Sequence, residues 1–173
     1  MDANADAMPG FAIFRAGEGG PLSDIMHAEP LSEIEREGRV RLDEAGFRNG
    51  HVEKVLFQVP GMSLTWFWFK SRFPLPRHSH DCDCLYYIVA GSLSMGDEEL
   101  GPGDGFFVPA DAPYVYTVGD GGVEGLEFRA TNRFNFRMLA NNPAFWSRAE
   151  ETLRSRSGPW ARERAPAAVL RGG

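Results

Sequence analysis

The chain has 173 residues, of which 43% are hydrophobic, and a formal net charge of −6. This length suits one compact domain with terminal extensions and allows a sizeable buried core. The acidic balance, with no basic cluster, argues against nucleic acid as the main partner. No apolar run reaches the ~18 residues that a membrane helix needs, and residues 1–10 lack the basic start and apolar centre of a secretory signal. We therefore expect a cytoplasmic protein with neither a membrane nor a nucleic-acid partner.

Residues 1–50 are expected to form an N-terminal arm with a short helix or edge strands. The beginning of this arm is rich in Ala, Gly, Asp and Pro, a composition that favours a mobile terminus. Ser32 followed by Glu35 resembles a helix-capping box, in which each residue satisfies a backbone donor of the other. This pair predicts a short helix over about 32–37.

Residues 51–132 contain short runs of β-forming residues separated by turns, which is typical of an antiparallel sandwich or barrel. The loop Gly119–Gly122 is expected to separate the last two strands. Strand 62–70 is apolar on both faces, so it needs cover inside the barrel or from a second subunit. The predicted strands span residues 51–59, 62–70, 85–89, 92–95, 105–109, 114–118 and 123–129.

Residues 133–173 are expected to form a C-terminal helix and an irregular tail. Asn142 is suited to cap a helix, and Pro143 is suited to its first position. An apolar stripe at helical spacing follows, so we predict a helix over about 143–155 that packs on the barrel or on a partner subunit. The stripe consists of Phe145, Trp146, Ala149 and Leu153.

The densest concentration of chemistry lies at residues 78–84, which read His-Ser-His-Asp-Cys-Asp-Cys. Alternate side chains on an extended segment point the same way, so His78 and His80 can share a target to which Cys84 returns after a short bend. Imidazole and thiolate are ligands of borderline-soft transition metals. We therefore predict a metal site, with Cys82 as a loop thiol outside it. A disulfide between the cysteines is not expected, because side chains two residues apart on an extended segment lie roughly 7 Å apart.

The same residues resemble the first motif of the cupin superfamily, a His-x-His pair followed by a Glu and by a strand that ends in Gly. Here the motif reads His78-Ser79-His80, then Cys84, then Gly91. The second cupin motif starts with Gly, has Pro six positions later and His after a further five. Here it reads Gly103, Pro109 and Tyr114. The resemblance covers about 62–130 and implies an all-β, double-stranded β-helix (jelly-roll) barrel in a single-domain protein.

The chain departs from the family pattern at several positions. Arg72 and Asp111 stand where the family has Gly, Cys84 takes the place of Glu, and Tyr114 that of the last His. The usual cupin site has three His and one Glu facing inward at one mouth of the barrel. With His78, His80 and Cys84 as the ligands here, the softer set favours one divalent ion, Zn or Fe(II), with Ni or Cu also open. The loss of two family ligands leaves a vestigial site without metal as the alternative.

Further site residues are predicted from the rule that alternate residues of a strand point to the same face. Tyr86 shares the parity of Cys84 and is predicted, with Tyr114, to supply an acid, a base or an oriented hydroxyl. Trp66 and Trp68, at alternate positions of one strand, are expected to line an aromatic substrate pocket together with Tyr116, with core packing as the alternative. His51 stands alone before a strand and is expected to be solvated.

Three functions are compatible with these patterns. The first is a metal-dependent enzyme of oxygenase, isomerase or lyase type that acts on a small organic substrate. The second is a non-catalytic barrel that binds a small molecule and has lost its metal. The third is a structural role with strand 62–70 as a dimer face. A homodimer is expected in each case, because the family resemblance implies exchange of strands or arms between barrels.

Overall fold

The computed structural model describes residues 10–167. Residues 1–9, from which the absence of a secretory signal was argued, lie outside the described residues. The last part of the predicted irregular tail, residues 168–173, also lies outside them. Within this range no helix is long and apolar enough to cross a membrane.

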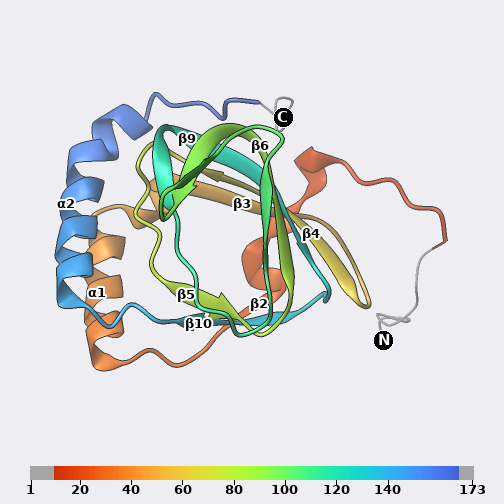
Figure 1. Ribbon diagram of the computed structural model, residues 1–173, viewed down its shortest axis with the longest axis horizontal. Coiled ribbons are helices and arrows are strands. Elements are labelled where there is room, and N and C mark those ends of the chain that lie inside the picture. The colour runs from red at the N-terminus through yellow and green to blue at the C-terminus, as the bar shows by residue number, and fades with distance from the viewer. Residues whose placement is uncertain (1–9, 168–173) are drawn as a thin grey trace.

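The protein is a jelly-roll built from two facing β-sheets, with two helices packed along one side (Figure 1). The smaller sheet has the order β2 (Met26–Ala28), β10 (Phe134–Met138) and β5 (His78–His80), with β2 parallel to β10. The larger sheet has the order β1 (Gly20–Pro21), β3 (His51–Val59), β4 (Met62–Phe69), β9 (Thr117–Arg129), β6 (Cys84–Met95) and β7 (Glu98–Leu100), and β8 (Gly105–Val108) also pairs with β6.

The strands differ from the sequence pattern in several places, among them β5 and β7, which were not predicted, and residues 114–116, which were predicted as strand but precede β9. The predicted loop Gly119–Gly122 is wrong, because this segment continues β9, which pairs with β6 through register shifts typical of bulges. Similarly, β6 runs without a break through Gly91. Strand β10 was not predicted, although it alternates apolar residues, and β1, β2 and β10 all come from outside residues 51–132.

Backbone conformation supports the two cupin motifs. Gly91 and Gly103 have φ values of 74° and 96°, and a Cβ at Gly91 would overlap the carbonyl oxygen of Gly122. Arg72 and Asp111, which replace family glycines, have φ values of 55° and 62° and are the two non-glycine residues with positive φ in the described chain. The left-handed conformation is thus kept at both positions, although an L side chain disfavours it.

Both predicted helices form where their caps indicate, and both are longer than predicted. Helix α1 (Glu33–Glu44) begins with the expected capping box between Ser32 and Glu35. Helix α2 (Pro143–Trp160) begins after Asn142, whose side chain accepts a hydrogen bond from the backbone N–H of Ala144. Short 3-10 helices occur at Ala16–Glu18 (η1), Leu22–Asp24 (η2) and Phe47–Gly50 (η3).

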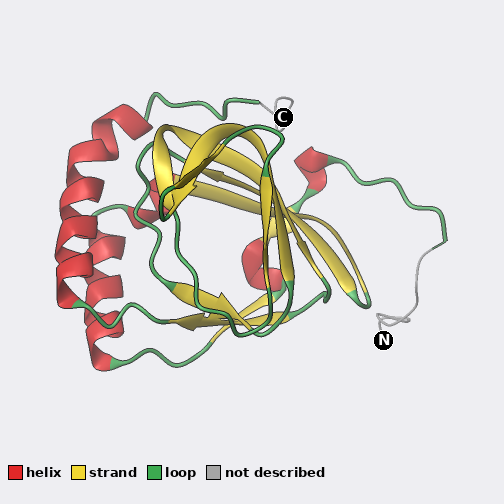
Figure 2. Ribbon diagram, viewed as in Figure 1, coloured by secondary structure: helices red, strands yellow, loops and turns green. Residues whose placement is uncertain are grey.

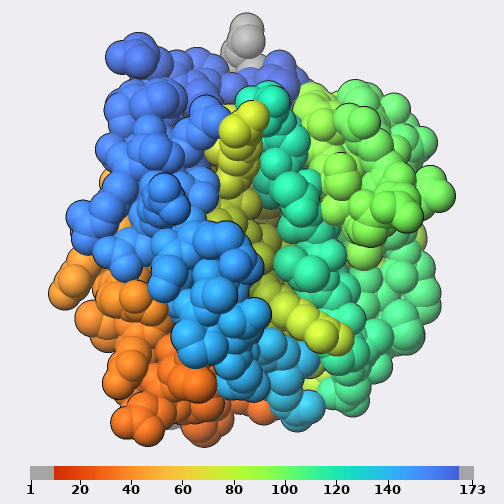
Figure 3. Space-filling model, turned by 60° about the vertical axis from the view of Figure 1, so that its left-hand side comes forward, coloured from red at the N-terminus to blue at the C-terminus, as the bar shows by residue number. Residues whose placement is uncertain are grey.

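The two helices lie side by side along one side of the two sheets (Figure 2). Gly38 of α1 allows the ring of Trp146 of α2 to come close, and the indole Nε1–H of Trp146 donates to the carbonyl of Ala140. In the space-filling view the helices, orange and blue, form one surface with the yellow-green segment that follows β4 (Figure 3). This helical layer brings Arg39 and Phe47 to the end of the space between the sheets.

Strand β4 is buried on both faces, and segments of the same chain cover its outer face. Trp66 and Trp68 pack there with Leu126 and Ala165, and the indole Nε1–H of Trp66 donates to Glu124 at 2.9 Å. The expected burial of both faces of this strand is therefore confirmed, and the chain itself supplies the cover.

Candidate functional site

A cavity of about 350 Å³ lies between the two sheets. This volume is in the range of pockets that bind small organic molecules. Its walls are mainly aromatic. Polar side chains gather at two places on them, one around His80 and Glu127 and the other around His51 and Glu53. The aromatic and histidine side chains that line it are Phe47, His51, Phe67, Phe69, Phe73, His78, His80, Tyr86, Tyr114, Tyr116, Phe134 and Phe136.

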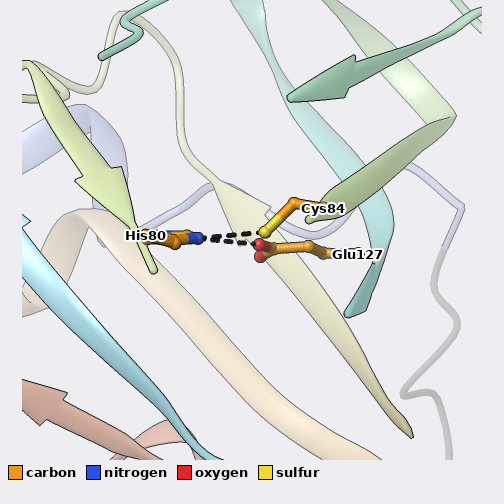
Figure 4. Close-up of side chains that lie close together, drawn as sticks. All are labelled: His80, Cys84 and Glu127. Atoms are coloured by element: carbon orange, nitrogen blue, oxygen red, sulfur yellow. Dashed lines mark hydrogen bonds and ion pairs between the residues drawn. The ribbon is translucent and has the colours of Figure 1, made fainter. Parts of the chain in front are cut away.

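One polar group joins three strands of the two sheets, and two of its members, His80 and Glu127, line the cavity. His80 comes from β5, Cys84 from the start of β6 and Glu127 from β9, and their side chains converge (Figure 4). His80 Nδ1 lies 3.2 Å from Cys84 Sγ and 3.5 Å from Glu127 Oε1. The possible ligand atoms of the three residues all lie within 4.8 Å of one another, and all three side chains are buried.

Glu127 is held as a carboxylate by its neighbours. Its Oε2 is ion-paired with Arg129 Nη2, and its Oε1 accepts a hydrogen bond of 2.6 Å from the hydroxyl of Tyr86. Burial raises the pKa of this carboxyl, but the charge of Arg129 and hydrogen bonds from His80 and Tyr86 outweigh burial and lower the pKa to about 2. Arg129 also donates to Thr65 Oγ1, lies 4.1 Å over the ring of Phe134, and keeps one buried Nε–H without a partner in the described chain.

The two cysteines occupy different environments. Cys84 is buried, whereas Cys82 lies between β5 and β6 and is partly exposed, with 4.0 Å between the two sulfur atoms. Both are free thiols, as expected. The contact with Cys82, burial and the charge of Glu127 raise the pKa of Cys84, so its thiol stays protonated unless a cation binds it.

His78 lies beside the three residues but is not one of them. Its Nδ1–H donates to the carbonyl of Pro76 at 2.8 Å, because a carbonyl can only accept. Burial lowers the pKa of His78 to about 4, so the ring is neutral at pH 7 with its lone pair on Nε2. Such a hydrogen bond from the far nitrogen is the usual way in which proteins orient a metal-binding histidine.

The predicted tyrosines meet in the cavity. The hydroxyls of Tyr86 and Tyr114 lie 2.5 Å apart, and Tyr114 forms an isolated β-bridge with His78 rather than part of the predicted strand. Burial and then the charge of Glu127 raise the pKa of both phenols well above the ordinary value. Tyr116 also lines the cavity, as expected.

Two other sequence expectations need correction. Trp66 and Trp68 do not line the cavity; Phe67 and Phe69, at the opposite parity of β4, do. Both faces of β4 are apolar, so the sequence pattern could not tell the inner face from the outer one. His51 was expected to be solvated, yet it lies among Phe47, Phe69 and Phe73 on the cavity wall.

Glu127 was missed by sequence reasoning. Two charged residues at the same parity of an otherwise β-forming run, Glu127 and Arg129, are the signal that could have found it. Charges that face a core must be paired.

The donor set at His80, Cys84 and Glu127 fits a transition metal. Ligand bonds of about 2.0–2.3 Å in a tetrahedral site place ligand atoms roughly 3.3–3.8 Å apart. The distances from His80 Nδ1, 3.2 and 3.5 Å, are close to this range. One imidazole, one sulfur and one carboxylate oxygen are also the ligand types that zinc and iron accept.

No protein-family model and no curated protein sequence matches the chain. Among solved structures it is similar to the polyketide cyclase RemF from Streptomyces resistomycificus, at 24% identity over 60% of this chain and 83% of that one, with a TM-score of 0.48. It is also similar to KdgF from a Halomonas species, at 20% identity over 49% and 82%, TM-score 0.44. A cupin superfamily protein from Desulfitobacterium hafniense matches at 22% identity over 47% and 77%, TM-score 0.41. At these values the similarity concerns the fold alone.

The two motifs, their left-handed backbone positions and the facing sheets give the chain the cupin fold. Its polar centre combines His80 and Cys84 of the first motif with Glu127 of a later strand.

Proposed function

We propose that the protein is a metal-dependent cupin enzyme that acts on a small organic molecule bound in the cavity. The observation that carries this proposal is the convergence of His80, Cys84 and Glu127, of which His80 and Glu127 line a cavity of about 350 Å³. Three protein ligands leave coordination positions for water or substrate, which is the pattern of catalytic sites. A bound divalent metal supplies Lewis-acid chemistry, and Fe(II) in addition supplies dioxygen chemistry.

The types of the proposed ligand atoms indicate which metals the site would bind. Sulfur and imidazole favour Zn or Fe(II), with Ni or Cu also compatible, over Mg or Mn. His78 is proposed as a further ligand, because its hydrogen bond to Pro76 leaves the lone pair on Nε2 and because it lines the same cavity; with four protein ligands, an open position for water or substrate requires a coordination number above four. Its ring centroid lies 5.2 Å from that of His80.

The tyrosines are proposed to orient the substrate. Tyr86 donates its one hydroxyl proton to Glu127, so Tyr114 donates to Tyr86 and keeps its lone pairs for a hydroxyl or amino proton of the substrate. Since the pKa of each phenol is raised, both stay neutral at pH 7 and act as oriented hydroxyls rather than as bases. This arrangement suits oxygenase, isomerase or lyase chemistry.

A specific observation favours a second candidate, a non-catalytic barrel that binds a small molecule. The charge of Glu127 is already balanced by Arg129, and its oxygens already accept hydrogen bonds from the protein. The cluster is therefore electrically neutral before any cation binds. This candidate predicts ligand binding without stoichiometric metal.

Metal content per subunit distinguishes the two candidates. The protein is purified without added metal or chelator and compared with His80→Ala, Cys84→Ser and Cys82→Ser. We expect close to one equivalent of metal in the wild type and in Cys82→Ser, the matched control, and a loss in the other two variants. Absence of metal, with no uptake of Zn, Fe(II), Ni or Cu, would leave the non-catalytic barrel as the account of the cavity.

We also propose a homodimer. Leu85, Phe107 and Phe128 form one cross-strand row on the outer face of the larger sheet, and they are 51%, 59% and 37% exposed. An exposed apolar row of this kind marks an interaction surface. Sedimentation of the wild type and of Phe107→Lys tests it: a dimer that the substitution dissociates is expected, and a monomeric wild type would contradict it.

A further inference from the structure

A second polar group lies on the cavity wall away from Cys84. Glu53 and His51 are alternate residues of β3, and Tyr116 lies just before β9. In the sheet register Glu53 stands opposite Phe67, and Glu127 opposite Thr65, on the two sides of β4. The backbones of the two residues are therefore offset by two strand spacings, about 9–10 Å across the sheet, and by two residues, roughly 7 Å, along the strand direction. The groups belong to one cavity and to different parts of it.

Several polar atoms of this second group make no hydrogen bond with the protein, although His51 Nδ1 contacts the carbonyl of Phe47. The carboxyl of Glu53 and the hydroxyl of Tyr116 make no hydrogen bond with any described residue, and Tyr116 is only 5% exposed. His51 Nε2 lies 3.7 Å from Glu53 Oε2, which is too long for a hydrogen bond. The side chains of His51 and Glu53 are 20% and 26% exposed and, like Tyr116, line the cavity, so their free polar atoms are available to whatever fills it.

The hydrogen-bonding roles of the three groups are defined. His51 Nδ1 lies 3.2 Å from the carbonyl of Phe47 and must be its donor, which leaves a lone pair on Nε2. Burial lowers the pKa of His51 to about 4, so the ring is a neutral acceptor at pH 7. Glu53 accepts when ionised, whereas the Tyr116 hydroxyl can donate. The group as a whole therefore offers both hydrogen-bond acceptors and a hydrogen-bond donor to a ligand.

We propose that Glu53, His51 and Tyr116 form a second polar subsite that binds a hydroxyl group carried by an aromatic ring. A hydroxyl donates its proton to Glu53 or His51 and accepts one from Tyr116, whereas an ammonium cannot accept. Arg39 also lines the cavity, with its guanidinium ion-paired with Asp43 at 3.2 Å, and offers no partner to a cationic ligand. The rings of Phe67, Phe69 and Phe73 surround the subsite and suit a planar ring by offset or edge contacts.

Titration of Glu53 gives the subsite a pH dependence. Burial and, second, the charge of Glu127 raise the pKa of Glu53 to about 7, against the opposing charges of Arg129 and Arg39. His51 is neutral in this range, and burial keeps the phenol of Tyr116 neutral as well. Affinity for a hydroxyl donor therefore rises between pH 6 and pH 8 as Glu53 ionises.

The test compares 2-naphthol with 2-methoxynaphthalene, which has the same rings without the donor. Binding to the full chain is measured by calorimetry at pH 8, before and after treatment with a chelator. We expect 2-naphthol to bind about tenfold more tightly, because a hydrogen bond to an ionised group is worth at least this factor. The preference persists after chelation, since the subsite does not depend on the proposed metal.

Variants separate this subsite from a general effect on the barrel. Glu53→Gln and Tyr116→Phe are each expected to reduce the preference for 2-naphthol to about threefold or less. Glu98→Gln on the exposed hairpin strand β7 is the matched control and keeps it. Equal affinity of the wild type for the two ligands, no saturable binding of 2-naphthol, or an undiminished preference in both variants would overturn the proposal. Loss of the preference on chelation would also overturn it, because the hydroxyl would then be recognised at the metal.

Discussion

The guanidinium of Arg129 is ion-paired with the carboxylate of Glu127 two residues earlier on β9, and the two side chains are 1% and 6% exposed. This pair faces the cavity and supplies the charge that keeps Glu127 ionised beside His80 and Cys84. The acidic component of the candidate metal centre is thus part of a buried ion pair, and this has a measurable consequence for stability.

Removal of Arg129 leaves Glu127 buried without a counter-charge. Arg129→Met is therefore expected to lower the free energy of unfolding by about 3–5 kcal/mol in chemical denaturation. Arg137→Met is the control, because Arg137 pairs with Glu29 at 2.8 Å on the surface, where ion pairs contribute little. A similar loss in the two variants would show that burial does not set the strength of the Arg129 pair.

Substitution of Arg72 or Asp111, which have a left-handed backbone, is predicted to increase the stability of the fold rather than to lower it. Glycine adopts positive φ without the steric cost of a Cβ, so Asp111→Gly is expected to stabilise the fold by about 0.5 kcal/mol. Arg72→Gly should stabilise it more, because Asp tolerates this conformation better than Arg. Thermal unfolding measures both, with Arg77→Gly as a control at a position without positive φ, where a loss is expected. Destabilisation in all three would contradict the assigned conformation.

Stability should depend on pH through Glu53. Because the pKa is raised from 4.5 to about 7 on folding, the folded state holds a proton that the unfolded state releases. The contribution is complete below about pH 4.5 and is lost as pH rises through 7, up to about 3 kcal/mol. Glu53→Gln removes this dependence, so its stability relative to the wild type is expected to increase from pH 5 to pH 8. A constant difference across this range would count against a raised pKa.

The contact between the two helices predicts a destabilising alanine. A Cβ at Gly38 would overlap the buried ring of Trp146, so Gly38→Ala is expected to cost about 2 kcal/mol although Ala favours helices more than Gly. Val40→Ala, on the exposed side of α1, serves as the control and should be close to neutral. If Gly38→Ala also proves neutral in chemical denaturation, the helices do not pack as closely as described.

Local sequence signals were sufficient for much of the fold. The capping pair Ser32 and Glu35 marks the start of α1, and Asn142 with Pro143 marks the start of α2, because these residues satisfy backbone groups of their own first turn. The positions at which the cupin motifs have glycine also indicate where the backbone is left-handed, because the position keeps its positive φ even when another residue occupies it. Arg72 shows this directly.

The arrangement of the site depended on long-range pairing that a single sequence does not record. Glu127 reaches His80 only because β9 pairs with β6 while β5 lies in the facing sheet. The two apolar faces of β4 gave no means to prefer Phe67 over Trp66 as a wall of the cavity. His51 was likewise placed by the packing of α1 and η3, which no local pattern predicts.

Cys84 links the sequence motif to the proposed metal centre, so the most direct measurement is X-ray absorption of the protein loaded with one equivalent of zinc. The account predicts one sulfur neighbour at about 2.3 Å together with lighter nitrogen and oxygen neighbours. The sulfur contribution should vanish in Cys84→Ser and remain in Cys82→Ser. A shell of nitrogen and oxygen alone in the wild type, or a failure to take up zinc, would contradict a centre built on His80, Cys84 and Glu127.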